Sequence, residues 1–324
     1  MAQCPPLLSR LVASSVTASA HAGKIIRDVL SKGELNIVEK GKNDLQTEAD
    51  RSAQKCIVES LARQFPGVTI IGEEGASSCE VPKEWIIKDM DQEVLKLKLP
   101  QHLENVEPKD VCVWVDPLDG SSRRVEFFWS TSHLPNDRTS EYTQGLVEHV
   151  TVLVGVAVGD RAVGGVIHQP YYRDAKDSVV GRTLWGIDGV GTGGFKTIPP
   201  AEGKRIITTT RSHSNKTVQA ALDAMEPDEV LRVGGAGHKV LLLLEGKAHA
   251  YVFASGGCKR WDTCAPEAIL HAVGGRLTDL YGERYPYDAN TPHPNARGVL
   301  AIAPGQIHSW YVSRIPEEVK QQLQ

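Results

Sequence analysis

The sequence predicts an α/β protein, and three observations carry this prediction. Short apolar runs typical of strands alternate with helical patterns through the second half of the chain. The first half combines helical segments with a clear β-hairpin. Two of its predicted strands end in carboxylates, and in sheets covered by helices the sites gather at strand ends. The 324 residues are 41% hydrophobic, enough for one large or two medium domains with packed cores.

The overall composition excludes several classes of partner. A net charge of −4 with 23% charged residues leaves no polybasic surface for a nucleic acid polymer. The longest apolar stretch, residues 150–158, is too short to cross a bilayer, so no membrane partner is expected. No basic start followed by a long apolar core marks a secretory signal. The six cysteines have no regular spacing, and we expect reduced thiols in a cytoplasmic protein.

Two helices are expected near the N-terminus. Residues 5–30 alternate small and apolar side chains at helical spacing and reach a stop near Gly33. Residues 36–41 are either a short strand or a loop. A second helix runs to about Gln64. Asp50 lies in its first turn, where it either complements the helix dipole or is a carboxylate poised near a metal-bound water.

Acidic residues follow two predicted strands of the first half. Residues 68–71 form a strand that runs into Gly72-Glu73-Glu74. Residues 111–115 form a short buried strand that runs into Asp116-Pro117-Leu118-Asp119-Gly120-Ser121. Since strand ends carry the sites of such sheets, the two acidic motifs are candidates for one site.

The second of these motifs has the chemistry of a metal site. Pro117 has a fixed φ and Gly120 permits unusual conformations, so a rigid turn can aim carboxylates at one point. Asp116 and Asp119 with the Leu118 carbonyl suit Mg²⁺, and free amides beside them suit a phosphate. The simpler alternative is a type I turn in which Asp is a local hydrogen-bond acceptor.

The rest of the first half consists of an irregular segment and two hairpins. Residues 75–110 are polar and charge-rich, which indicates a surface excursion that can act as a mobile flap. A strong hairpin joins residues 150–158 to residues 162–168. The glycine-rich residues 186–194 surround another exposed hairpin. Pro199-Pro200 is a plausible domain seam.

The second half alternates strands with helix starts. Strands are expected over residues 206–209, 230–233 and 250–253. Asp262 precedes Pro266 and a helix that runs to about Val273, which is the position of an ordinary N-cap with Pro in the first turn. A carboxylate has lone pairs to spare, so Asp262 can cap the helix and also bind a metal.

Three separated motifs, taken together, resemble the metal-site motifs of a known family. They are Gly72-Glu73-Glu74, Asp116-Pro117-Leu118-Asp119-Gly120-Ser121 and Trp261-Asp262-Thr263-Cys264-Ala265-Pro266. In this order they are similar to the motifs of the inositol monophosphatase superfamily, the lithium-sensitive, magnesium-dependent phosphomonoesterases. The likeness covers nearly the whole chain. The segment Leu45-Gln46-Thr47-Glu48-Ala49-Asp50 and residues 206–216 make it closest to members that act on bisphosphate nucleotides.

The resemblance implies a role for each matching residue. It implies that two or three Mg²⁺ ions are held by Glu73, Asp116, the Leu118 carbonyl, Asp119 and Asp262. It implies that Asp50 and the hydroxyl that follows Gly120 orient the attacking water. It implies that the nucleotide or its second phosphate, above a helix N-terminus, contacts Thr210, His213, Gly235 and Lys239. The expected reaction converts 3'-phosphoadenosine 5'-phosphate to AMP and phosphate by metal-activated water.

One segment departs from the family pattern. Residues 121–138 separate Gly120 from Thr139, and their removal would restore Gly120-Thr139-Ser140-Glu141-Tyr142-Thr143. The catalytic hydroxyl is therefore Ser121, because it adjoins Gly120, or Thr139, because the residues after it match the family. We favour Ser121 because the turn holds it close to the metals. The insertion lies beside the reaction centre and can impair catalysis.

The resemblance also implies an architecture, a layered αβαβα sandwich of the sugar-phosphatase and inositol monophosphatase type. An α+β half, residues 1–198, would carry most metal ligands and the inserted loop 121–138. An α/β half, residues 199–324, would carry the substrate-binding residues and Asp262. We expect a monomer that acts on a small-molecule phosphate. The alternatives are an inositol polyphosphate 1-phosphatase, which can be the same enzyme, and a phosphonucleotide-binding protein impaired by the insertion.

Overall fold

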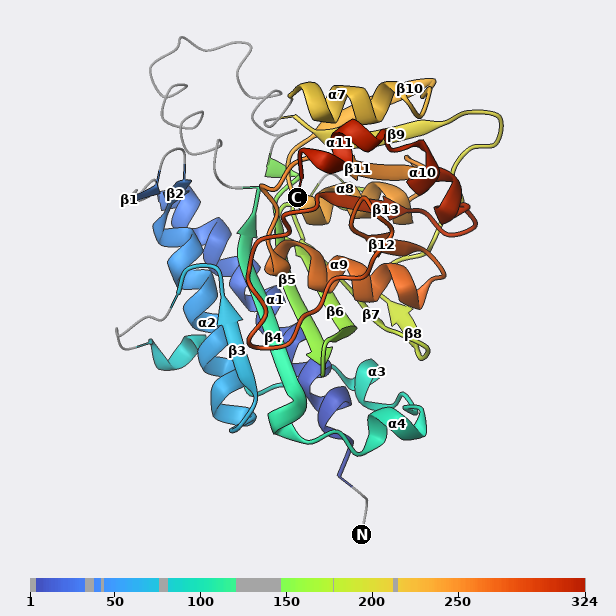
Figure 1. Ribbon diagram of the computed structural model, residues 1–324. Helices are drawn as coiled ribbons and strands as arrows, with labels where there is room; N and C mark the ends of the chain where they lie inside the picture. Colours follow the sequence, from blue (N-terminus) through green and yellow to red (C-terminus); the bar gives the residue numbers. More distant parts are fainter. Residues whose placement is uncertain are drawn as a thin grey trace.

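The computed structural model describes residues 4–32, 38–41, 44–75, 81–120, 147–176, 178–211 and 215–323. Two long helices near the N-terminus, α1 (Leu7–Lys32) and α2 (Glu48–Gln64), pack side by side (Figure 1). Both expected helices are therefore confirmed. Between them in sequence, β1 (Val38–Gly41) and β2 (Asp44–Gln46) form a small antiparallel sheet, so a strand rather than a loop lies in the 36–41 segment.

The first large sheet has six strands. In spatial order they are β3 (Thr69–Gly72), β4 (Val111–Asp119), β5 (Thr151–Val158), β6 (Arg161–Gln169), β7 (Arg182–Ile187) and β8 (Gly191–Gly193). Only the β3–β4 pair is parallel, and the other neighbours are antiparallel. Both predicted hairpins are present, as β5–β6 and β7–β8, although the central residues of β7 are buried rather than exposed.

The second sheet has five strands in the order β10-β9-β11-β13-β12. They are β9 (Ile206–Thr210), β10 (Glu229–Val233), β11 (Ala250–Phe253), β12 (Arg276–Thr278) and β13 (Val299–Ile302). The first three are mutually parallel, as strand–helix alternation predicts. The helices of this half are α7 (Lys216–Asp223), α8 (Ala236–Leu244), α9 (Arg260–Ala272), α10 (His308–Arg314) and α11 (Glu317–Gln321).

Alternation along β4 and β11 shows how the layers stack. Val113 of β4 packs into the core that contains α1 and α2, whereas Trp114 packs into the core that contains α8 and α9. Phe253 of β11 joins this second core from the other side, and Val252 faces the core of α7, α10 and α11. The order is therefore α1 and α2, the six-stranded sheet, α8 and α9, the five-stranded sheet, and the outer helices (Figure 1). The predicted αβαβα sandwich is confirmed.

The expectation of a surface excursion over residues 75–110 agrees with the part that the structure describes, because within residues 81–110 only three side chains are buried. Residues 81–110 form two short α-helices and two 3-10 turns, which are η1 (Lys83–Trp85), α3 (Gln92–Leu95), α4 (Gln101–Glu104) and η2 (Pro108–Asp110). Val94, Leu99 and Leu103 are buried in the core beside α1. Helices α3 and α4 bury one residue each, and η1 and η2 bury none, so no periodic pattern in the sequence reveals the buried residues.

The predicted boundary between residues 198 and 199 stays a prediction. The six-stranded sheet ends at Gly193 and the second sheet begins at Ile206. Helix α9 belongs to the second half but packs on five strands of the first sheet, β4 to β8, so the halves share a core. Five cysteines lie in the described part, and all five are free thiols. None of the helices described there combines the length and apolar character that crossing a membrane requires.

Candidate metal centre

The parallel strands β3 and β4 bring the first two acids together. Their register pairs Gly72 with Val115, so the next residues are Glu73 and Asp116. The Glu73 amide donates to the Val115 carbonyl at 3.0 Å, which holds the chain beside β4 after β3 ends. The Glu73 side chain forms a hydrogen bond with Asp116. Parallel strands end at the same edge of a sheet, and this geometry makes neighbours of two acids far apart in sequence.

A β-bulge places Asp116 and Asp119 on the same face of β4. The strand continues to Asp119, so the predicted strand over 111–115 followed by a free turn is too short. Asp116 pairs with Leu153 and Asp119 pairs with Thr151, so three steps on β4 match two on β5. Residues three apart in a regular strand point to opposite faces, but the extra residue of a bulge restores the same face. This is the face of Trp114, which looks toward α9.

Three donors fix the Asp119 carboxylate. It accepts hydrogen bonds from the amides of Ala236 and Gly237 at 2.9 and 2.8 Å, and from Thr151 Oγ1 at 2.7 Å. Asp119 therefore caps α8 across the interface between the two halves. The helix N-terminus expected below the second phosphate already has these two amides bound to Asp119. Sequence reasoning missed Thr151, which faces Asp119 only through the pairing of β4 with β5.

Asp262 reaches the site from the start of α9. It is the third residue of the helix, and the Lys259 amide donates to one of its carboxylate oxygens at 2.6 Å. The predicted N-cap position for Asp262 is therefore wrong, because Lys259 is the N-cap. Pro266 lies in the helix interior and not in the first turn. The capping interaction uses one carboxylate oxygen, and Asp262 also forms a side-chain hydrogen bond with Asp116.

These acids form a cluster that suits a metal ion. Carboxylate oxygens of Asp116, Asp119 and Asp262 all lie within 4.8 Å of one another. Asp116 and Asp119 are 2% and 6% exposed, so water solvates their charge poorly. Burial, and then the charges of Glu73, Asp119 and Asp262, raise the pKa of Asp116 well above its ordinary value. Burial and then Asp119 raise the pKa of Asp262 to about 6.

The donor set passes the chemical test for a hard divalent cation. Asp116 forms hydrogen bonds to two other carboxyl groups, and each such bond requires one of the partners to carry a proton. A divalent cation can replace that proton and relieve the repulsion among the remaining charges. All the candidate side-chain ligands are oxygens, which is the preference of Mg²⁺ and Ca²⁺.

Asp50 is anchored by the residue that begins α2. Thr47 is the N-cap of this helix, and its amide and hydroxyl donate to Asp50 Oδ2 at 2.8 and 2.5 Å. Asp50 is 2% exposed, and burial raises its pKa to about 6 although the bonds from Thr47 lower it. The charge of Glu74 raises this pKa further, so Asp50 lies near the acidic end of β3. Both roles expected for Asp50, helix capping and a poised carboxylate, are compatible with this position.

Three of the expected substrate-binding residues that the structure describes lie beside the acidic cluster. Thr210 ends β9 and pairs with Val233, two residues before Gly235. Gly235 is the N-cap of α8 with φ of 73°, and a Cβ there would lie 3.0 Å from Asp119 Oδ2. Lys239 is buried, and its Nζ donates to the Gly235 carbonyl at 2.8 Å. These residues therefore adjoin the cluster from the side of α8.

Four expected site residues remain, and the structure describes one of them. Leu118 is buried between the two aspartates, and its amide donates to Asp116 at 3.0 Å. Its carbonyl as a metal ligand stays a prediction. Ser121, Thr139 and His213 lie outside the described residues, as does the whole insertion 121–138.

Fold and site together define a class of protein. The family described as "Inositol monophosphatase family" matches residues 7–320, and the chain belongs to this family. Over 326 aligned residues the chain is 50% identical to 3'(2'),5'-bisphosphate nucleotidase 1 of Homo sapiens. That alignment covers 100% of this chain and 99% of the relative. The resemblance inferred from the three motifs is therefore confirmed.

Two solved structures have the same fold. One is the extragenic suppressor protein suhB from Bartonella henselae, with a TM-score of 0.63 and 18% identity over 94% of this chain and 97% of that one. The other is an IMPase from Thermotoga maritima, with a TM-score of 0.61 and 20% identity over 96% of this chain and 98% of that one. At such low identities these structures bear on the fold alone.

Proposed function

We propose that this protein is a Mg²⁺-dependent phosphomonoesterase that removes the 3'-phosphate of 3'-phosphoadenosine 5'-phosphate, giving AMP and phosphate. The observation that carries the proposal is 50% identity, over the whole chain, to a protein named 3'(2'),5'-bisphosphate nucleotidase 1. The acidic cluster at the end of β4 supports it, because hydrolysis of a phosphate ester needs charge stabilisation and positioning more than a covalent nucleophile.

Two or three Mg²⁺ ions would be held by Glu73, Asp116, the Leu118 carbonyl, Asp119 and Asp262. When bound, Mg²⁺ offsets the repulsion among the carboxylates, lowers the pKa of a bound water and stabilises charge on the phosphoryl oxygens. The chain prepares for this by fixing its ligands. Asp119 has three donors and Asp262 has the Lys259 amide, so both carboxylates keep their direction without an ion.

Asp50 would orient the attacking water and accept its proton. Its two bonds from Thr47 hold the carboxylate in one place. With a pKa of about 6 it is mostly ionised at neutral pH and still basic enough to take a proton. The hydroxyl of Ser121, or alternatively of Thr139, would help to orient the same water.

Residues at the start of α8 would bind the second phosphate. Lys239 supplies a buried positive charge next to the acidic cluster, and Thr210 and Gly235 lie on the adjoining backbone. His213 would complete the set. A phosphatase that acts on simple monoesters needs no additional cationic group at this position. A phosphatase that acts on a bisphosphate nucleotide needs one, because the substrate carries a second phosphate.

The test is release of phosphate by the full-length protein with and without Mg²⁺. We expect Mg²⁺-dependent conversion of 3'-phosphoadenosine 5'-phosphate to AMP, inhibited by lithium, and slower release from inositol 1,4-bisphosphate. The Asp116→Asn variant should be inactive, and the Arg63→Ala variant, altered on the exposed face of α2, should match the wild type. Absence of Mg²⁺-dependent release from the nucleotide would reject the proposal. Turnover only after deletion of residues 121–138 would instead indicate a binding protein impaired by the insertion.

We also propose that the protein acts as a monomer in the cytoplasm. The free thiols of the five described cysteines support a reducing compartment. Light scattering of the purified protein and fluorescence of a tagged chain in cells test the two parts separately. A dimer mass or a signal confined to an organelle would overturn the respective part.

A further inference from the structure

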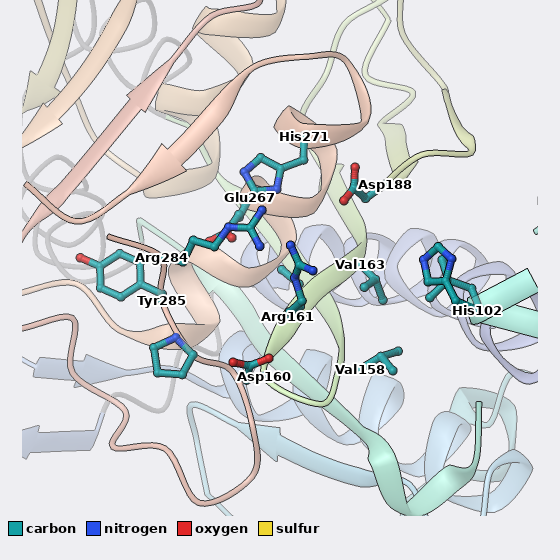
Figure 2. Close-up of a pocket in the computed structure, with 13 residues that line it drawn as sticks. His102, Val158, Asp160, Arg161, Val163, Asp188, Glu267, His271, Arg284 and Tyr285 are labelled. Carbon is teal, nitrogen blue, oxygen red and sulfur yellow. The ribbon is translucent and has the colours of Figure 1, made fainter. Parts of the chain in front are cut away.

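A cleft lies away from the acidic cluster. It has a volume of about 570 Å³ and opens near the turn of the β5–β6 hairpin (Figure 2). Its walls come from α4, this hairpin, the residue after β7, the second half of α9 and residues 284–286. Thr151 at one end of β5 contacts Asp119, whereas Val158 at the other end lines the cleft. The length of β5 therefore separates the two sites by roughly 20 Å.

Two guanidinium groups from distant segments face this cleft. Arg161 projects from the start of β6 and Arg284 from the loop before Tyr285, and their side chains extend toward each other (Figure 2). Within the described part of the chain, neither guanidinium forms a hydrogen bond or an ion pair with a carboxylate. A pair of unpaired arginines is a ready receptor for an oxyanion, since each presents a planar fork of donors.

The wall behind these arginines adds positive charge. Arg260 is 7% exposed and stacks on the ring of Tyr285 at 4.6 Å. Its Nε and Nη1 atoms are buried and have no hydrogen-bond partner among the residues that the structure describes. Because the charge of Arg260 lies behind a lining residue and away from water, it raises the potential in the cleft.

The buried acid of the cleft does not cancel this charge. Glu267 is 3% exposed, and the Tyr287 hydroxyl donates to its Oε2 at 2.7 Å. Burial raises the pKa of Glu267 to about 8, so at neutral pH the carboxyl is mostly neutral and can donate a hydrogen bond. Asp160 and Asp188 line other parts of the cleft, where they can accept hydrogen bonds from a ligand.

We propose that this cleft binds a small organic anion, whose phosphate or carboxylate group lies between Arg161 and Arg284. Hydroxyl or amino groups of the same molecule would face Asp160 and Asp188. The volume suits a metabolite, since pockets for small molecules usually measure about 300 to 1,000 Å³. The proposal is independent of the reaction at the acidic cluster. Helix α9 would then serve both sites. Asp262 lies near its start, and Glu267 and His271, further along the helix, line the cleft.

Calorimetry on the full-length protein freed of metal tests the proposal. Without metal the acidic cluster repels anions, so binding of an anion reports the cleft. The probes are citrate, glycerol 3-phosphate and inorganic phosphate, each up to 10 mM. We expect saturable binding of citrate, of glycerol 3-phosphate or of both, and the preferred probe distinguishes a carboxylate ligand from a phosphate ligand.

Variants locate the binding. Replacing both Arg161→Ala and Arg284→Ala should weaken it at least tenfold, and the single Arg284→Glu variant should do the same. Both arginines are exposed, and thermal unfolding of each variant checks that it folds. Arg63→Ala, which removes an exposed arginine elsewhere, should leave the affinity unchanged. The proposal is overturned by no saturable binding of either organic probe, by binding of inorganic phosphate alone as an adventitious ion only, or by undiminished affinity in the folded double variant.

Discussion

Helix α9 carries two acids five positions apart, and they lie in opposite electrostatic surroundings. Asp262, near the helix start, lies within 4.8 Å of two other carboxylates. Glu267, near the helix middle, is buried, and among the described residues its side chain has one hydrogen-bond partner, the hydroxyl of Tyr287. Burial raises the pKa of both, to about 6 for Asp262 and about 8 for Glu267. The same helix therefore supports one crowded acid and one solitary acid.

The difference shows what each arrangement needs. A solitary buried carboxyl group can become neutral by taking a proton, and one hydrogen bond then satisfies it. Crowded carboxylates repel one another at short distance, and the three hydrogen bonds that Asp119 accepts hold it in the cluster. The acidic cluster therefore lowers the stability of the folded protein until a cation is added. The solitary Glu267 needs no cation. Such a local sacrifice of stability is typical of functional sites.

The largest effect is expected from Asp116→Asn. Asparagine has the same shape, its oxygen can still accept from the Leu118 amide, and its amide nitrogen can donate to Glu73 or Asp262. Loss of one ligand should lower Mg²⁺-dependent phosphate release by at least about 100-fold. Loss of one crowded charge should raise the free energy of unfolding of the metal-free protein. Activity assays and urea titrations measure the two effects. A variant that is both active and less stable would contradict the view of Asp116 as a crowded metal ligand.

Addition of Mg²⁺ should give the next largest effect. Because the ion binds the folded cluster and not the unfolded chain, a concentration of 100 times Kd adds about 2.7 kcal/mol to the free energy of unfolding. The melting temperature should therefore rise with Mg²⁺ in the wild type and much less in Asp116→Asn. Glu267→Gln, altered at the solitary acid, should respond like the wild type. An equal rise in all three proteins would mean that Mg²⁺ binds elsewhere.

The sequence predicted the acidic cluster that contains Asp262 but not the buried, solitary Glu267, and the reasons are physical. Glu73 and Asp116 follow apolar strands, and strand ends are visible in a sequence. The bulge that brings Asp119 to the same face depends on how β4 pairs with Thr151, and register between strands has no local signal. The link from Asp119 to the amides of α8 spans the two halves of the chain.

The cleft near Glu267 was beyond prediction for the same reason. Arg161 and Arg284 are far apart in sequence and come together only because the loop before Tyr285 packs against the β5–β6 turn. Each is an ordinary charged residue in its local sequence. The αβαβα order, by contrast, followed from the motifs of the family, because those motifs cover nearly the whole chain.

A smaller effect, dependent on pH, is expected from Glu267→Gln. The folded state keeps the proton of Glu267 up to a pH of about 8, whereas the unfolded chain loses it near the ordinary value of 4.5. Its contribution to stability is therefore fully present below pH 4.5 and is lost as the pH rises toward 8. Glutamine has no proton to lose and can still accept from Tyr287. The variant should gain a few kcal/mol over the wild type at pH 8 and less than about 1 kcal/mol at pH 5. Urea titrations across this range measure the gap, and a constant gap would show that Glu267 does not titrate as described.

The smallest effect is expected from the same chemical change at the surface. Glu59 pairs with Arg63 along α2 at 3.1 Å, and the side chains are 37% and 59% exposed. Water and salt screen an exposed pair of this kind, so Glu59→Gln should cost less than about 0.5 kcal/mol at any pH from 5 to 8. Glu59→Gln and Glu267→Gln exchange the same atoms in the same chain. The difference between their effects on the free energy of unfolding therefore reports the effect of burial. If Glu59→Gln produced an equally large gap between pH 5 and pH 8, the gap would originate in the overall charge of the chain, and the contrast between solitary and crowded buried acids would lose its basis.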